Sequence, residues 1–302
     1  MPTHQHTYSA PAKINLTLDV LDRRPDGYHD LKSIFQSISI VDHITIEIDR
    51  SDVDNLSVTG EECGGVPADH TNIVMRAASR MKQLAADSGL TAPPVSIHLT
   101  KNIPSQAGLG GGSSDAAAAI LSLNELLGLG LSVSNLVSIG KDLGADVPYF
   151  LYGGLCRVEG IGDRIQPLPS LGEHFIVIVK PPAGVNTGEA YRLLDAIPGR
   201  KPGSATDLWP VSHPSERLPL HNDFEGVVLE HWPQIGNAHA VASETAARHG
   251  AYEPRLCGSG ACLFTLCATP EQSELIANDL TRAGIGKIWQ ARTITGGCIR
   301  VD

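Results

Sequence analysis

A glycine-rich stretch near residue 110 carries the residue types that most directly suggest chemistry. Segment 104–115 reads Pro-Ser-Gln-Ala-Gly-Leu-Gly-Gly-Gly-Ser-Ser-Asp and follows an alternating run at 95–100 that is typical of a half-buried strand. Strong helix formers follow at 116–127. Glycines let the backbone approach a ligand closely, and the free N–H groups and dipole of a helix N-terminus favour an anion. The succession of strand, loop and helix therefore predicts a phosphate site.

The well-known phosphate-binding patterns do not fit this loop. A Walker A loop needs Gly-Lys-Ser/Thr, but Lys141 is followed by Asp142 and Lys287 by Ile288. The dinucleotide fingerprint also fails, because Ser113 stands where a third spaced glycine is required. The glycine loop of protein kinases is a hairpin and does not open a helix. The alternative is a flexible turn before a capped helix, which four glycines in five positions disfavour through their conformational entropy.

Two charged residues stand in apolar surroundings that do not suit them. Lys13 and Asn15 share one face of a mostly apolar strand at 7–20, and a lysine there needs a partner unless it guards a sheet edge. Asp146 lies in Gly-Ala-Asp-Val-Pro and needs a donor or a cation, unless its side chain caps a turn. Taken singly, neither residue separates the functional from the structural alternative.

Two further turns carry candidate ligand contacts. Tyr28 and His29 directly follow a tight turn, where they could form a recognition edge for a planar ligand or simply pack over the turn. Without other evidence the packing alternative is preferred. A second glycine-rich turn, Gly-Ser-Gly-Ala at 258–261, precedes an apolar strand at 263–266.

Composition limits the classes of function. The chain has 302 residues and a net charge of −10, which argues against nucleic-acid or anionic-membrane surfaces and requires local donors for any anionic substrate. The N-terminus has no signal pattern, so we expect a cytoplasmic enzyme, a monomer or homodimer with no membrane partner. The six cysteines form no CxxC pair and the histidines no HExxH, so we expect buried thiols and no protein-built metal site.

The order of elements predicts two lobes with an α+β fold. We place the boundary at residue 160, giving an N-terminal lobe at 1–160 and a C-terminal lobe at 161–302. Helices are expected at 72–86, after the capping residue Ser132, and after the capping box formed by Thr269 and Gln272. The spaced strands and helices of the second half favour a ferredoxin-like arrangement.

Three motifs, taken together in order and spacing, resemble those of the GHMP small-molecule kinases over essentially the whole chain. They are Ala-Pro-Ala-Lys-Ile-Asn at 10–15, the glycine-rich loop, and the late Gly-Ser-Gly-Ala turn. The resemblance implies a two-lobed GHMP kinase fold, with an N-terminal mixed α/β lobe, a C-terminal ferredoxin-like α+β lobe and the active site in the cleft between them. Pro-Asp-Gly-Tyr-His at 25–29 and Gly-Ala-Asp-Val-Pro at 144–148 are similar to the branch that phosphorylates the 2-hydroxyl of a cytidine diphosphate sugar alcohol. That reaction uses ATP and belongs to the non-mevalonate route to isoprenoid precursors.

The resemblance also implies roles for the catalytic residues. Asp146 would accept or orient the proton of the substrate hydroxyl, and Lys13 would keep Asp146 ionised and steady the charge developing on the γ-phosphoryl group. Asn15 would position the alcohol. ATP, which carries Mg²⁺, would lie on backbone N–H groups of the loop from Gly108 to Ser114, with the hydroxyl of one of the two loop serines near the ion. The implied ATP-binding residues are Pro104, Ser105, Gln106, Ala107, Gly108, Leu109, Gly110, Gly111, Gly112, Ser113 and Ser114.

For the small-molecule substrate, the resemblance makes Tyr28 and His29 the readers of the cytosine and Tyr191 the aromatic ring that stacks on it. The late turn would close over the phosphates through Gly258, Ser259 and Gly260. The resemblance also implies that Asn72 and Lys101 approach the nucleotide.

Two alternatives to the cytidyl-substrate kinase stay open. One is a GHMP kinase for another alcohol, such as homoserine or mevalonate; the other is a catalytically silent protein of the same fold. The chain keeps Lys13 and Asp146, which a silent member would be expected to lose. All of these roles require those two side chains to meet at the mouth of the glycine-rich loop.

Overall fold

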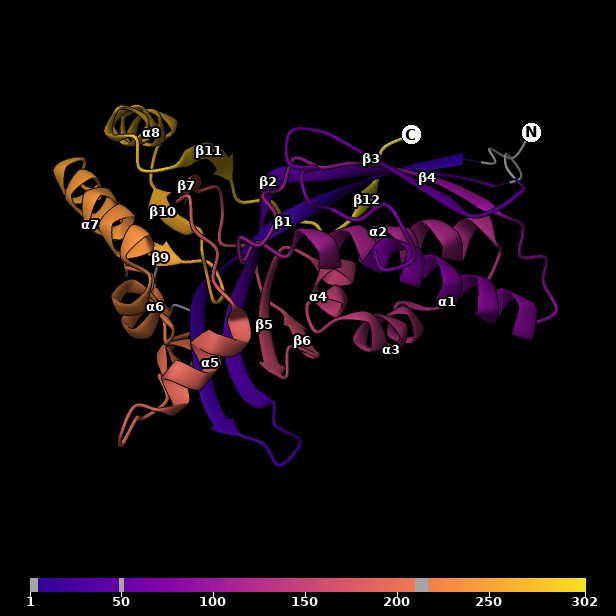
Figure 1. Cartoon of the computed structure of the whole chain (residues 1–302), viewed down its shortest axis with the longest axis horizontal. Coiled ribbons are helices and arrows are strands. Elements are labelled where there is room, and N and C mark those ends of the chain that lie inside the picture. Colours follow the sequence, from indigo (N-terminus) through magenta and orange to yellow (C-terminus); the bar gives the residue numbers. More distant parts are fainter. Residues whose placement is uncertain (1–4, 49–51, 210–216) are drawn as a thin grey trace.

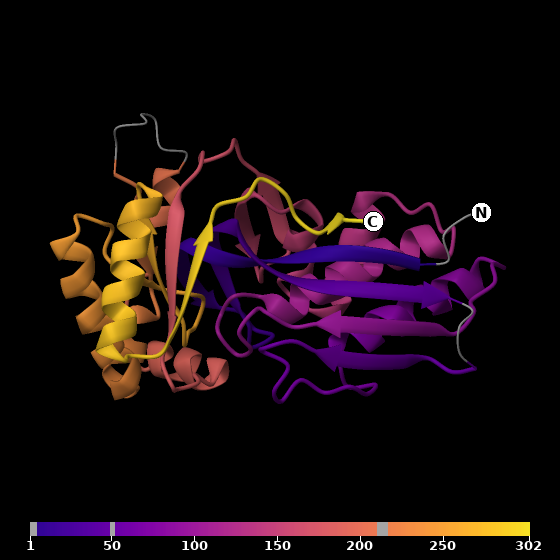
Figure 2. The ribbon, with the colours of Figure 1, turned by 90° about the horizontal axis from the view of Figure 1, so that it is seen from above.

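A computed structural model describes residues 5–48, 52–209 and 217–302 of the chain. Two β-sheets form its framework, the larger built mainly from the N-terminal half and the smaller from the C-terminal half, with helices against each (Figure 1). The strands of the larger sheet run along the molecule, and those of the smaller sheet lie across one end of it (Figure 2). A shared apolar core that includes Ile14, Leu16, Ile176 and Phe264 joins the two sheets.

The larger sheet is organised around one long hairpin. Strands β1 (Gln5–Arg23) and β2 (His29–Ile48) pair along most of their length, with register shifts near Pro11, Asn15 and Val20. The strand order of the sheet is β12-β1-β2-β4-β3. In addition, β5 pairs with β2, β6 pairs with β5, and β8 pairs with β1. The other strands are β3 (Asn55–Thr59), β4 (Val95–Thr100), β5 (Leu155–Gly160), β6 (Arg164–Pro167), β8 (His221–Asn222) and β12 (Ile299–Arg300).

Helices pack against one face of this sheet, below it in the view of Figure 1. They are α1 (Ile73–Asp87), α2 (Gly111–Leu126), α3 (Val133–Leu143) and α4 (Val147–Tyr152). The side chain of Ser132 accepts a hydrogen bond from the first turn of α3, as expected, and that of Asn72 caps α1 in the same way. The four alanines at 116–119 are completely buried, because α2 packs against β1 and β2 and has α1, α3 and α4 as neighbours. Small side chains are what so close a packing of helix on sheet requires.

The smaller sheet confirms the ferredoxin-like arrangement. Its order is β11-β7-β10-β9, and helices separate β7 from β9 and β10 from β11, which is the split βαβ pattern. Thr269 caps the last helix through Gln272, as predicted. The strands of the smaller sheet are β7 (Phe175–Lys180), β9 (Arg255–Leu256), β10 (Leu263–Cys267) and β11 (Lys287–Arg292). The helices of this lobe are α5 (Thr187–Asp195), the 3₁₀ turn η1 (Ala205–Leu208), α6 (Glu225–His231), α7 (Pro233–Arg248) and α8 (Pro270–Ala283).

Two details differ from the expectations. The sequence has strand-like runs at 31–40 and 44–48, which predict a bend at Asp42 between them, but β2 runs through that position without a break. The larger sheet also extends beyond residue 160, because β6 pairs with β5 and the end of the chain returns as β12 beside β1. A simple division at 160 therefore separates strands that belong to one sheet; the chain crosses between the lobes more than once.

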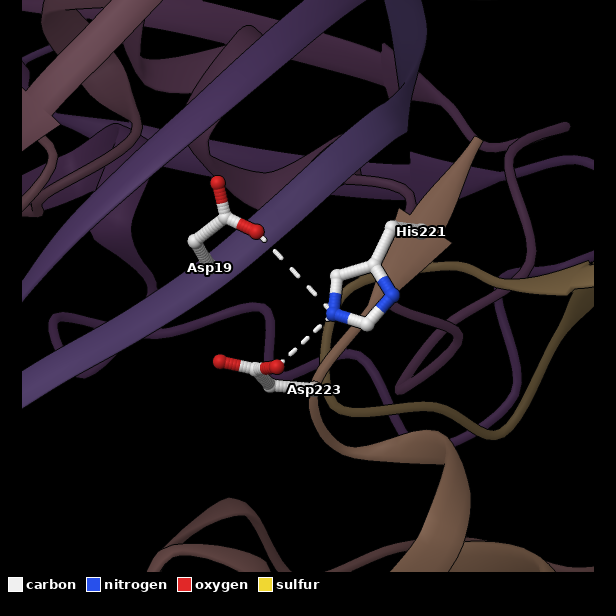
Figure 3. Close-up of side chains that lie close together, drawn as sticks. All are labelled: Asp19, His221 and Asp223. Atoms are coloured by element: carbon white, nitrogen blue, oxygen red, sulfur yellow. Dashed lines mark hydrogen bonds and ion pairs between the residues drawn. The ribbon is translucent and has the colours of Figure 1, made fainter. Parts of the chain in front are cut away.

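A small polar cluster fixes the loop before η1 to β1. His221 lies with its Nε2 2.8 Å from Asp223 Oδ1 and 3.9 Å from Asp19 Oδ1 (Figure 3). Asp19 also accepts a hydrogen bond from the N–H of Thr206, and Asp223 accepts one from the N–H of Val20. Of the side chains described, this is the one group close enough to share a metal ion. Backbone donors and His221 already satisfy its carboxylates, so a structural clasp explains the cluster.

This clasp predicts a pH-dependent part of the stability. The hydrogen bond to Asp223 raises the pKa of His221 above its ordinary 6.5. A raised pKa in the folded state means that the stabilisation is complete below the unfolded value and is lost as pH rises through the folded value. The melting temperature of His221→Asn should therefore fall furthest below that of the unaltered protein near about pH 6, and the difference should shrink toward about pH 8.5. His70→Asn, at an exposed position, is the control; equal differences at both pH values would contradict the clasp.

Candidate active site

Lys13 is a buried cation at the point where β1 meets the glycine-rich loop. Its backbone N–H donates to the carbonyl of Leu109 at 2.9 Å, and its side chain is only 5% exposed, which rules out a guard at a sheet edge. The ammonium Nζ lies 2.8 Å from Asn15 Oδ1, 3.5 Å from Asp146 Oδ2 and 4.4 Å from the centroid of the Phe35 ring. These neighbours offset the loss of hydration of the charge.

Asp146 faces that ammonium from the start of α4. It occupies the position before the helix, but its side chain makes no capping hydrogen bond, so a turn cap does not explain it. Its side chain is 31% exposed and thus reaches both Lys13 and the solvent-accessible cleft. Lys13 and Asp146 lie together as the resemblance implies, and their parts in catalysis stay predictions.

Asn15 connects this pair to the late glycine turn. Its Oδ1 accepts hydrogen bonds from Lys13 Nζ and from the N–H of Gly258 at 3.0 Å, while its Nδ2 donates to Ser33 Oγ at 3.0 Å. The second Nδ2 hydrogen is the one still available to a ligand. Asn15 therefore holds Lys13 and the late turn in place in addition to its expected contact with the alcohol.

The glycine-rich loop is packed too closely for side chains at two positions. A Cβ on Gly108 would lie 1.8 Å from the carbonyl oxygen of Cys257, and one on Gly110 would lie 2.7 Å from Cζ of Phe150. Both glycines have φ of 75°, a backbone conformation that glycine adopts without strain. The loop is thus held between β1, α4 and the late turn, and a flexible turn is excluded.

A cavity of about 450 Å³ follows the outer side of this loop. It is lined by all of 104–113, and by Asn72 and Lys101, which the resemblance places near the nucleotide. Ser114 is not among its lining residues: its N–H donates to Gly110 O at 3.0 Å and its hydroxyl lies 3.6 Å from Cys298 Sγ. The expectation that the N–H of Ser114 is free for a phosphate is therefore wrong, because α2 begins earlier, at Gly111.

Beneath the loop lies a buried charge cluster that the sequence analysis missed. Lys101 Nζ donates to Asp115 Oδ2 at 2.6 Å and to Asp42 Oδ2, and Asp42 Oδ1 accepts the N–H of Ile103 at 2.8 Å. These contacts tie β2, the end of β4 and the early turns of α2 together, and so fix both ends of the loop. Burial raises the pKa of Asp115 to about 8. The sequence offered one signal for this cluster, since Lys101 and Asp115 lie on either side of the loop.

A second cavity, of about 380 Å³, holds the Lys13–Asp146 pair. Asn15, Phe35, Gly258 and Ser259 also line it, whereas Gly260 lies behind the turn and does not. Gly108, Gly110 and Ser113 line this cavity and the cavity of the outer loop alike. A phosphate held by the loop would therefore border directly on the ion pair.

A third cavity, of about 660 Å³, brings the two aromatic predictions together. Tyr28, His29 and Tyr191 all line it, and Tyr191 also lines the cavity of the ion pair. The His29 and Tyr191 rings are stacked, with centroids 4.7 Å apart and planes 16° from parallel. Tyr28 is 64% exposed and its ring is free to close on a ligand. The arrangement offers aromatic surface to a planar group attached to whatever reaches the ion pair.

Comparison with known proteins agrees with this geometry. Models of the GHMP kinase N-terminal and C-terminal domains match residues 72–154 and 241–286. A 4-diphosphocytidyl-2-C-methyl-D-erythritol kinase of Geobacter metallireducens is 42% identical over 92% of this chain and 94% of its own. The chain belongs to the GHMP kinase family.

Solved structures of this kinase family support the same fold. A crystal structure of a 4-(cytidine 5′-diphospho)-2C-methyl-D-erythritol kinase matches with a TM-score of 0.75 and 30% identity, covering 96% of this chain and all of that one. A homoserine kinase from Cytophaga hutchinsonii matches with a TM-score of 0.74 at 18% identity, covering 100% and 98%, which supports the fold alone. Within the part of the chain that the structure describes, no helix has the length and apolar character needed to span a bilayer.

The packing of the loop gives a stability prediction. Gly110→Ala should lower the melting temperature, because the new methyl group meets Phe150 in addition to the strain of a positive φ. Gly128→Ala is the matched control, since Gly128 has φ of 63° but open space around it. We expect Gly128→Ala to cost about 1 kcal/mol and Gly110→Ala at least about 2 kcal/mol, measured by chemical denaturation. Equal losses would show that the clash with Phe150 is relieved at no cost.

Proposed function

We propose that this GHMP kinase transfers the γ-phosphoryl group of ATP to the 2-hydroxyl of 4-diphosphocytidyl-2-C-methyl-D-erythritol, a step toward isoprenoid precursors. The names of the relatives that match nearly the whole chain support this substrate. The observation that carries the proposal is the continuity of the cavities. Tyr191 borders both the aromatic cavity and the Lys13–Asp146 cavity, and Ser113 borders both that cavity and the one beside the loop.

In this proposal the loop binds the triphosphate through its backbone. The first N–H groups of a helix have no partner within it, and those of Gly111, Gly112 and Ser113 open α2 beside the nucleotide cavity. A Cβ on Gly112 would find nothing closer than 3.8 Å, so the space beside it is open to a ligand. Mg²⁺ carried by ATP would neutralise phosphate charge, and the hydroxyl of Ser113, which lines both the loop cavity and the ion-pair cavity, would hold it.

The Lys13–Asp146 pair would carry the chemistry. Asp146 would accept the proton of the attacking hydroxyl as its oxygen bonds to the γ-phosphorus, while the bond from that phosphorus to the β–γ bridging oxygen breaks and ADP leaves. An ammonium has three N–H donors, and the oxygens of Asn15 and Asp146 engage two of them. The third can stabilise the equatorial oxygens of the transferring group, whose charge is greatest in the transition state.

The aromatic cavity would hold the cytosine and so align the alcohol. Tyr191 packs edge-on against Phe224 with ring centroids 4.9 Å apart, which fixes the orientation of its ring. Binding energy gained at the base, away from the reacting atoms, is then available to position the 2-hydroxyl against Asp146. Homoserine and mevalonate carry no such base and would leave this cavity empty.

The direct test is a phosphorylation assay with purified protein and the three competing alcohols. We expect turnover with 4-diphosphocytidyl-2-C-methyl-D-erythritol to exceed that with homoserine or mevalonate by at least about a hundredfold in kcat/KM, because only the first alcohol fills the aromatic cavity. Phosphorus NMR of the product would identify the 2-phosphate. Preference for another alcohol would replace the proposed substrate, and no turnover with any of them would favour a silent protein of this fold.

The role of Asp146 predicts a specific kinetic defect. Asp146→Asn should lower kcat by about 10²–10⁴-fold, since a neutral amide cannot accept the proton. ATP binding, followed by calorimetry, should change little because Asp146 does not line the nucleotide cavity. Asp142→Asn, at an exposed position four residues earlier, supplies the control for the change of charge. Unaltered kcat in Asp146→Asn would remove this carboxylate from the mechanism.

A further inference from the structure

Helix α5 presents two residues, one turn apart, to the imidazole of His29. Tyr191 stacks against the ring with centroids 4.7 Å apart, and Asp195 Oδ1 lies 2.8 Å from Nε2. Residues four apart lie on the same face of a helix, so a single element fixes both the plane and the edge of the ring. The side chain of His29 is only 4% exposed and is held on two sides.

Asp195 is poorly placed for helix stability. It is the last residue of α5, where the helix dipole disfavours a negative charge. The nearby cation on the helix, Arg192, pairs instead with Glu189 at 3.5 Å. Among the described residues, His29 is the one polar partner that the structure gives to the Asp195 carboxylate. An asparagine or lysine would suit the helix end better, so the carboxylate is explained by what it does to His29.

The hydrogen bond to Asp195 determines which nitrogen of the neutral ring carries the proton. An ionised carboxylate can only accept, so Nε2 must be the donor and Nδ1 is left as an acceptor. Within the described segments, Nδ1 of His29 has no hydrogen-bond partner. His29 also lines the 660 Å³ cavity proposed for the base. The ring therefore offers an acceptor to whatever enters.

That acceptor distinguishes the two pyrimidines. Cytosine carries an amino group at C4, which donates hydrogen bonds, whereas uracil carries a carbonyl oxygen there, which accepts them. We propose that Asp195 is a specificity-determining residue that, by fixing the tautomer of His29, selects cytosine over uracil in the aromatic cavity. This inference rests on the proposed function, in which that cavity holds the base. Asp195 acts through His29 and is a positioning residue.

The test compares the binding of cytidine and uridine monophosphates by calorimetry. The unaltered protein should bind the cytidine nucleotide at least about tenfold more tightly, because uracil leaves the Nδ1 lone pair facing an acceptor. Asp195→Asn should narrow this ratio to within about threefold, since an amide can donate to Nε2 and so release the other tautomer. Asp195→Glu keeps an acceptor-only group and should retain part of the ratio. Glu189→Gln makes the same change of charge on α5 at a residue that does not itself line the cavity and should leave the ratio unchanged.

A second measurement on the unaltered protein does not depend on how Asp195→Asn folds. Long-range ¹H–¹⁵N spectra, with the His29 signals assigned by their loss in His29→Asn, report which ring nitrogen is protonated. A proton on Nε2 supports the inference, and a proton on Nδ1 of the neutral ring overturns it. An unchanged nucleotide ratio in a folded Asp195→Asn protein, or no ratio in the unaltered protein, also overturns it.

These outcomes are separate from the fate of the proposed function. If 4-diphosphocytidyl-2-C-methyl-D-erythritol is not phosphorylated but the nucleotide ratio depends on Asp195, the substrate is wrong and the base selection stands. If the substrate is phosphorylated and Asp195→Asn keeps the full ratio, the kinase stands and the inference fails.

Discussion

The site depends on one buried ammonium. Lys13 is carried into the interior by a strand that must be apolar to join the two sheets, and a charge in that position requires compensation. Asp146 and Asn15 provide it from opposite sides, and Asn15 in turn holds the late turn through Gly258. Three segments far apart in the sequence are thereby fixed around one nitrogen. The charge of Lys13 is thus compensated by the same side chains to which the proposed reaction gives roles.

The glycine-rich loop is also held in position by a few specific contacts. Its inner side follows β1, where the N–H of Lys13 bonds to Leu109, and its two ends are tied by the Lys101 cluster. Gly108 and Gly110 allow the backbone to lie against the late turn and Phe150. A loop held in this way presents its N–H groups at fixed positions, so little conformational entropy has to be lost when a phosphate binds. The loop is rich in glycine, but its packing against β1, Phe150 and the late turn keeps it rigid.

Sequence reasoning recovered the elements with local signals and missed contacts that only folding creates. The caps at Ser132 and Thr269 and the strand at 95–100 are local, and the structure confirms them. The meeting of Lys13 and Asp146 was predictable from the resemblance to the GHMP kinases, because neither charge taken singly pointed to the other. The returning strand β12 and the exclusion of Ser114 from the nucleotide cavity were not, since two residues of β12 carry no periodicity and the start of α2 differs from the alanine run by five residues. No sequence signal pointed to Asp195, because its role depends on a contact with His29, which lies 166 positions away in the chain.

The charge balance of the site explains why the chain can be acidic and still accept anionic ligands. A net charge of −10 gives no long-range attraction for a triphosphate, so recognition must come from short-range donors. In the proposed reaction, backbone N–H groups at the start of α2 and one ammonium would provide them, and the ammonium already faces Asp146. The arriving phosphoryl group would then share Lys13 with Asp146. Transfer of the hydroxyl proton to Asp146 would neutralise that carboxylate and weaken its attraction for the ammonium. The same lysine would thus stabilise the carboxylate in the ground state and the phosphoryl group in the transition state.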